Sequence, residues 1–413
     1  MGIGRRTARE WCAPRHRGQR VVIAAALVAL LALAACSDSP AAPLETTVLR
    51  LCATFDWFAY RNEGGEWMRV AGSAGTYEFA ATERLAIAYA RLSTANTSSD
   101  LRVNFLTAAQ AAGVYGCGAT TIPPSGTVSG TVGGLAGDDY ADVTYGASSS
   151  TARSTSPSIL LYAYTGATDL VATSVAPVRA PDHADRLIIR RAQSYAAGSS
   201  IALDFSSNEA LAPAENVLTW NGAGAHVQVN YRTPSGNNHV LQSTVVGAAA
   251  QRSPLYSIPT VRQVAGDVHE LLLGSGQRRV MLYYREARDR SLTLGPPASP
   301  PTFTTLATTP YRRVRVEVPA QSEYDASVSV LFQQLGSLVG MVATREYFGG
   351  TPQTWSLSVP DLRGVAGFDA TVGLQAGRFD WTINVSSRPY LFAPLQATDG
   401  HVNRFATVAG QQQ

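Results

Sequence analysis

The chain has 413 residues, with 33 basic and 30 acidic side chains and a formal net charge of +3. Charged residues make up only 15% of it, against roughly 25% in an average soluble protein, while the hydrophobic share of 45% is ordinary. This composition excludes a disordered chain and indicates a globular protein with room for roughly two to four domains.

The basic excess lies entirely at the N-terminus. Residues 1–35 hold six arginines and one acid, Glu10, and the rest of the chain has 27 basic and 29 acidic side chains, a net charge of −2. Because binding to nucleic acid depends on a surplus of basic side chains, we predict no nucleic-acid partner.

Residues 21–35 are fifteen apolar residues without a break, and arginines precede them. As a helix this run is about 22 Å long at ~1.5 Å per residue, short of the ~30 Å hydrocarbon core of a bilayer. We therefore predict that residues 1–35 are a secretory signal peptide that is cleaved from the mature protein.

The end of this run, Leu33-Ala34-Ala35-Cys36, resembles the lipobox of bacterial lipoprotein precursors: an aliphatic residue, two small residues and a cysteine. The resemblance implies that the Cys36 thiol carries diacylglycerol, that the chain is cut before it, and that its amine takes a further acyl chain such as palmitate. Two or three acyl chains hold a protein stably on a membrane. Ser37 implies the outer membrane by the family's sorting rule. The alternative is an ordinary secretion signal that happens to contain Cys36.

The cysteines fit an exported protein. Cys12 leaves with the signal peptide and Cys36 carries lipid, so Cys52 and Cys117 remain in an oxidising compartment. We predict a disulfide between them. It would close a loop of about 65 residues and stabilise the fold by roughly 4 kcal/mol on the chain-entropy model. Two free buried thiols are the alternative.

Two stretches rich in proline and glycine, residues 122–126 and 295–301, interrupt the mature chain. They predict a lipidated tether over 36–47 and three β-sandwich segments over 48–122, 126–294 and 303–413. A further break at Ala212-Pro213 leaves open whether the middle segment is one module or two.

Most periodic segments have period two. Apolar and polar side chains alternate, as they do in a strand with one buried face, over residues 226–231, 313–318, 326–332, 354–359 and 379–384. Such segments recur with turn residues between them, which predicts an all-β fold of serial antiparallel β-sandwich modules. One short helix is expected after Thr107, because Thr107 and Gln110 have the spacing of a capping box.

Cys52, Trp67 and Cys117, with Tyr115 two places before the second cysteine, resemble the immunoglobulin pattern of paired cysteines, core tryptophan and Tyr-x-Cys. The resemblance implies an immunoglobulin-like sandwich, in which the disulfide joins two sheets. The Cys52–Trp67 spacing is slightly long for that family, so an unspecified sandwich with the same disulfide is the alternative.

Local signatures of catalysis are absent from the sequence. No G-x-S-x-G pentapeptide occurs. His269-Glu270 begins like a zinc-protease motif, but no second histidine follows one turn on, and its surroundings read as a strand. After the signal peptide five histidines remain, none at metal-ligand spacing from another, and we expect no cofactor and no metal.

Two acidic clusters, at 138–142 and 182–185, could offer oxygen ligands to calcium, although aspartates are equally favoured in turns. Two aromatic groups could bind a glycan. One is Trp57, Phe58, Tyr60 and Trp67 around a glycine-rich turn. The other is Tyr283-Tyr284 beside Arg285, Arg288 and Arg290. For both groups we expect burial or cation–π contact in preference to ligand binding.

The anchor, the serial sandwiches and the missing catalytic signatures together predict a non-catalytic binding or scaffolding module at the bacterial cell envelope. Its partners would be the membrane, through the lipid, and an unidentified protein or glycan. The alternative is a lipid-anchored hydrolase or glycan-processing enzyme, since a pair of carboxylates from distant loops would leave no local signature.

Overall fold

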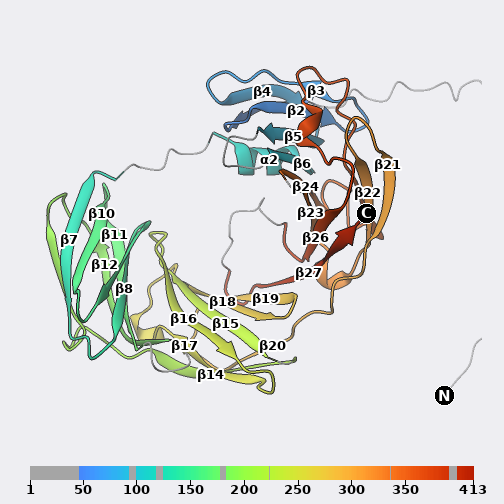
Figure 1. Cartoon of the computed structure of the whole chain (residues 1–413). Coiled ribbons are helices and arrows are strands. Elements are labelled where there is room, and N and C mark those ends of the chain that lie inside the picture. The colour runs from blue at the N-terminus through green and yellow to red at the C-terminus, as the bar shows by residue number, and fades with distance from the viewer. Residues whose placement is uncertain are drawn as a thin grey trace, which may run out of the picture. The chain divides into compact units, whose positions relative to one another are not determined.

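The computed structural model describes residues 46–92, 99–117, 124–176, 183–222, 224–334, 336–389 and 398–413. These residues belong to one compact unit, Thr46–Gln413. The predicted signal peptide, Cys36 and the tether up to residue 45 lie outside the described residues. Strands dominate the described elements, so the all-β prediction is confirmed (Figure 1).

The first segment carries β1 (Thr47–Cys52), β2 (Trp57–Asn62), β3 (Met68–Arg69), β4 (Thr76–Ala81), β5 (Arg84–Arg91), β6 (Ser99–Thr107) and α2 (Ala108–Tyr115). β1 and β4 form a small sheet that, with α2, packs on one face of β2, β5 and β6. The predicted capping box begins α2: the Gln110 amide donates to the Thr107 hydroxyl, and the Thr107 amide donates to the Gln110 side chain. The helix ends at Tyr115, where the Gly116 amide donates to the Ala112 carbonyl.

The next part forms a sandwich with its own core. Its strands are β7 (Gly126–Gly133), β8 (Tyr140–Tyr145), β9 (Ser148–Arg153), β10 (Ser158–Ala163), β11 (Thr168–Val175), β12 (Ala184–Gln193) and β13 (Ser200–Asp204). The sheet β10-β7-β13 packs on the sheet β12-β11-β8-β9. Side chains cap an edge of the smaller sheet, since the amides of Leu160 and Tyr162 donate to the hydroxyls of Ser150 and Ser148.

A further core lies over residues 214–294. Its strands are β14 (Ala214–Trp220), β15 (Ala225–Arg232), β16 (Asn238–Val246), β17 (Arg252–Ser257), β18 (Val268–Ser275), β19 (Arg278–Tyr284) and β20 (Arg290–Leu292), with a 3-10 helix at Thr260–Arg262. The sheet β17-β14-β20 packs on β16-β15-β18-β19. Val227, Val229 and Tyr231 alternate into this core, as the period-two pattern predicts.

The last part carries β21 (Thr302–Ala307), β22 (Arg313–Pro319), β23 (Ser327–Gln334), β24 (Ser337–Thr344), β25 (Thr354–Ser358), β26 (Phe379–Ser386) and β27 (Val402–Gln412). It also holds 3-10 helices at Ser322–Tyr324 and Ala370–Val372. The sheet β21-β22-β25 covers one face of strands that belong to a much larger sheet.

This larger sheet has twelve strands, in the order β16-β15-β18-β19-β27-β26-β23-β24-β6-β5-β2-β3. It takes strands from all three of the segments that the sequence predicts. Two pairs join strands of different segments, the antiparallel pair β19–β27 and the parallel pair β24–β6 (Figure 1). In the parallel pair Met341 lies opposite Val103. Two other parallel pairs, β13–β7 and β14–β20, also connect strands distant in sequence. The division into segments at 48–122, 126–294 and 303–413 stays a prediction.

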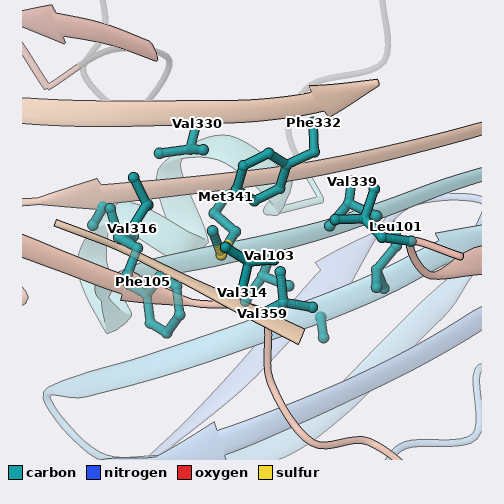
Figure 2. Packing of buried hydrophobic residues seen from close by; sticks show 14 of the residues in the cluster. Leu101, Val103, Phe105, Val314, Val316, Val330, Phe332, Val339, Met341 and Val359 are labelled. Carbon is teal, nitrogen blue, oxygen red and sulfur yellow. The ribbon is translucent and has the colours of Figure 1, made fainter. Parts of the chain in front are cut away.

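The largest core therefore combines both ends of the described chain. Leu101, Val103 and Phe105 of β6 pack with Val314 and Val316 of β22 (Figure 2). All five are less than 8% exposed. Because β6 is buried on this face by β22 and on the other face by the core under β1 and β4, it has no solvent-facing side over most of its length.

Candidate functional site

β2 places three of the four predicted aromatic residues inside the protein. Phe58 and Tyr60 point into the core under β1 and β4, while Trp57 points into the core under β22. Their exposed fractions are 0%, 9% and 4%, respectively. The expectation that both faces of this strand are buried is confirmed, so these three rings cannot stack on a ligand.

Trp67 is the fourth ring, and it lies differently. It follows the turn between β2 and β3 and is only partly buried. The Arg61 guanidinium lies over it, 5.2 Å from the ring centroid, at cation–π distance. Tryptophan and arginine are both enriched among the residues that dominate binding at protein interfaces.

Arg61 and Trp67 line a hollow of about 500 Å³, which we call the Trp67 groove. Segments far apart in the sequence meet there. The lining consists of Arg61, Trp67, Phe105, Leu306, Arg313, Arg315, Tyr347, Phe348, Ser356, Ser358, Val359, Pro360 and Asp361. The groove thus depends on the same packing of β6, β22 and β25 that forms the largest core.

Aromatic contacts fix the turn that follows β24. The ring of Tyr347 lies 5.3 Å from that of Phe105 and 5.4 Å from that of Phe348, measured between centroids. Phe348 in turn meets Trp355 edge-on at 5.6 Å, and Trp355 is fully buried. Such a chain of contacts holds Tyr347 and Phe348 in place on the groove wall.

β22 supplies the guanidinium groups because its side chains alternate. Val314 and Val316 enter the core, so Arg313 and Arg315 point to the other face of the sheet. Arg315 is exposed and donates through Nε to the Ser358 hydroxyl at 3.4 Å. β22 is the middle strand of its sheet, with β21 and β25 on either side, so the surface over it is built of side chains.

Asp361 carries the negative charge of the groove. Its carboxylate contacts Arg313 and accepts from Nε of Arg363 at 2.8 Å. The hydrogen bonds from Arg363, aided by the charges of both arginines, lower the pKa of Asp361 to about 2. Asp361 is therefore ionised at any physiological pH and neutralises part of the charge of Arg313 and Arg363.

Two guanidinium groups of the groove remain without an ionic partner. Within the described part of the chain, no carboxylate lies at ion-pair distance from Arg61 or Arg315. The described lining contains no histidine or cysteine, the commonest general base and the most nucleophilic thiol. Its chemistry is that of holding an anion against aromatic rings, with hydroxyls beside it.

Sequence reasoning identified Trp67 of this groove but not the rest. In the sequence, Arg313 and Arg315 indicate only the solvent-facing side of a strand. Tyr347 and Phe348 belong to no pattern that indicates binding. An exposed Arg-x-Arg on a strand whose other face is valine could have been flagged as a charged surface. Nothing local could have placed it beside Trp67.

Tyr283 and Tyr284, the second predicted aromatic group, lie at the end of β19 and are buried. Both rings are 1% exposed or less. Tyr284 hydrogen-bonds Ser257 at 2.9 Å, and Arg290 lies over its ring at 4.8 Å. The expected cation–π contact is present for Arg290.

His269 is a structural residue. Its Nε2 accepts from the Ile258 amide at 2.9 Å, its Nδ1 lies 3.3 Å from the Tyr284 carbonyl, and its ring stacks on Tyr284. A second imidazole, His239, is held between the hydroxyls of Thr144 at 3.1 Å and Thr173 at 2.8 Å. Burial lowers the pKa of both histidines to about 4, so both are neutral at pH 7.

The acidic cluster at 138–142 serves local structure. Asp139 accepts from the Ala136 amide at 3.3 Å, and Asp142 accepts from the Thr151 hydroxyl at 2.7 Å. In the second cluster Asp185 accepts from the Ala176 amide at 3.0 Å, and Asp182 lies outside the described residues. Among the residues that the structure describes, no group of three potential ligands could hold a metal ion.

Cys52 and Cys117 form a disulfide with a Cα–Cα distance of 4.9 Å. Both residues are exposed, at the end of β1 and just after α2. Tyr115 lies in the helix that the capping box begins, and Trp67 packs on the core on the far side of β2. The sandwich layers agree with the immunoglobulin resemblance, whereas the buried disulfide against a core tryptophan does not occur.

No family model and no curated protein matches the chain. A streptococcal ancillary pilin shares 8% identity, covers 70% of this chain and 95% of its own, and has a TM-score of 0.18. The TIE protein of Bacillus anthracis shares 8% identity over 88% of this chain and 73% of its own, with a TM-score of 0.15. Similarity this low supports no inference. No described helix is both long and apolar enough to traverse a bilayer.

Proposed function

We propose that the chain is a lipid-anchored, non-catalytic binding protein of the bacterial cell envelope, attached to the outer membrane through Cys36, and that the Trp67 groove holds its partner. The lipobox residues 33–36 support the anchor. The all-β fold supports display of a surface beside a membrane.

The groove is the observation that carries this proposal. It joins accessible guanidinium groups, aromatic rings and hydroxyls in one hollow, the side chains by which proteins hold ligands. By contrast, the imidazoles of His239 and His269 have both ring nitrogens committed to hydrogen bonds inside the protein. Two of the five described histidines, the side chains best suited to acid–base chemistry at neutral pH, are therefore used for structure.

One observation favours the alternative, a glycan-processing enzyme with a carboxylate site. Asp138, Asp139 and Asp185 line a second hollow, of about 590 Å³, together with Arg186. Two carboxylates across a sugar suffice for glycoside hydrolysis. Asp139 and Asp185 already accept backbone hydrogen bonds, which favours the structural interpretation.

A substrate screen separates the two functions. The chain from Ser37 to Gln413 should show no turnover of ester, peptide or polysaccharide substrates, because the groove holds binding groups alone. Hydrolysis that is lost in Asp138→Asn or Asp185→Asn, with circular dichroism unchanged, would establish the carboxylate enzyme instead. Arg315→Gln, in the other hollow, is the matched control.

Replacing Cys36 with Ala tests the anchor. The variant should accumulate as uncut precursor and take up no labelled palmitate, because the thiol is the atom that receives the lipid. The wild-type chain should be shorter, labelled and recovered with the outer membrane. Labelled Cys36→Ala protein of mature size would refute the anchor.

A further inference from the structure

We infer that the Trp67 groove takes a carboxylate-bearing polysaccharide, a chain of uronic-acid type, whose carboxylates pair with Arg61 and Arg315. The inference rests on the proposed binding function and specifies its ligand.

Charge sets the first requirement. Three arginines and one aspartate line the groove, and Asp361 is taken up by Arg313 and by Arg363 nearby. Arg61 and Arg315 are left for a ligand. A guanidinium matches the geometry of a carboxylate with two parallel N–H donors. An anionic ligand is thus favoured over a neutral one.

The amount of charge limits the kind of anion. Two unneutralised guanidinium groups are few for a densely charged nucleic acid, and the chain after residue 35 has a net charge of −2. The excess of positive charge is therefore local to the groove and does not extend over the protein surface as a whole. A polymer with one carboxylate per sugar ring fits it better than a chain of phosphates.

The uncharged lining favours a sugar over an acidic peptide. Trp67 and Tyr347 offer ring surfaces, and Ser356 and Ser358 offer hydroxyls. Peptides that bind to sheets usually add as a strand through backbone hydrogen bonds. The middle strand β22 has none to give, because β21 and β25 pair with it on both sides, and in this described sheet only the outer edges of β21 and β25 are left for such a strand. A sugar ring needs only the side chains that are present.

Binding to three polymers at low ionic strength tests the inference. In affinity electrophoresis, the chain from Ser37 to Gln413 should be retarded by polygalacturonate. It should pass freely through fully methyl-esterified polygalacturonate, in which the carboxylates are masked. Poly-glutamate supplies the same carboxylates without sugar rings and should retard the protein much less.

Variants locate the site. Arg61→Gln and Arg315→Gln should each weaken binding about tenfold, the usual effect of losing one charge-assisted hydrogen bond. Trp67→Ala should weaken it by about the same factor, because the ring surface is lost. Arg288→Gln removes an exposed guanidinium outside the groove, and Tyr162→Ala removes an exposed ring. Both variants should bind as wild type.

The failures are distinguishable. Equal retardation by poly-glutamate would replace the sugar by an acidic peptide and overturn the inference. Binding that Arg315→Gln leaves unchanged would place the ligand elsewhere. Absence of binding to all three polymers would overturn the ligand class and leave the proposed binding function standing, whereas cleavage of polygalacturonate would overturn the proposed function itself.

Discussion

Lowering the pH from 6.5 to 4 should destabilise the folded chain by several kcal/mol. His239 and His269 both have a pKa lowered by burial to about 4, against about 6.5 when exposed. Between these values the unfolded chain binds protons that the folded chain does not, so the free energy of unfolding falls as the pH falls. Each imidazole contributes roughly 3 kcal/mol at 1.36 kcal/mol per pKa unit.

The hydrogen bonds of His239 and His269 explain why these two imidazoles stay unprotonated in the folded protein. Protonation of His269 at Nε2 would remove the acceptor of the Ile258 amide and bring a charge near Arg290, which further lowers the pKa. His239 is 2% exposed, and its two described ring-nitrogen contacts are neutral threonine hydroxyls. Among the described residues, no carboxylate hydrogen-bonds to either imidazole.

Urea unfolding at pH 7.0, 5.5 and 4.5 measures the effect. The wild-type chain should lose stability across this range, and His239→Gln or His269→Gln should each reduce the slope by about one proton. The exposed His401 gives the matched control, His401→Gln. A stability that stays flat between pH 6.5 and 4.5 would contradict the assignment of two buried neutral imidazoles.

The sequence predicted the elements of this fold because their causes are local. Alternating valines in β22 and the Thr107–Gln110 capping box each act within a few residues, and the structure has both. The burial of β2 on both faces was also predictable, since Trp57 and Phe58 are large, adjacent and on opposite faces. The Cys52–Cys117 pairing followed from the count of thiols.

The arrangement of these elements was not predictable in the same way. The parallel register that places Met341 opposite Val103 joins residues that are distant in sequence, and both strands carry the same kind of alternating pattern as many others. The groove inherits this limitation. Trp67 and Arg315 line one groove because β6 and β22 share a core, and no local pattern in the sequence indicates that arrangement.

Replacing Asp267 with Ala should have the largest effect of any single substitution considered. Asp267 is 0% exposed and accepts from Nη2 of Arg191 at 2.7 Å, from the Tyr231 hydroxyl and from the Val264 amide at 2.8 Å. The substitution leaves the buried Tyr231 hydroxyl without this acceptor and removes one of the two ion pairs of Arg191, which is 23% exposed and keeps Asp169 at 3.3 Å. We expect a loss of about 3 kcal/mol, the lower end for breaking a buried ion pair. Urea unfolding at pH 7 should show a loss of that size.

Glu209→Ala is the matched control, because Glu209 also pairs with an arginine, Arg190, through two bonds of 2.7 and 2.8 Å, but its side chain is 37% exposed. Solvent screens that pair, so its removal should cost about 1 kcal/mol or less. Equal losses for the two variants would mean that burial does not set the strength of the Asp267 network.

Arg191 lies on β12 and Asp267 just before β18, so the network ties the sandwich at 126–204 to the core at 214–294. Asp267→Ala should therefore weaken that junction while leaving binding at the Trp67 groove unchanged, since no residue of the network lines the groove.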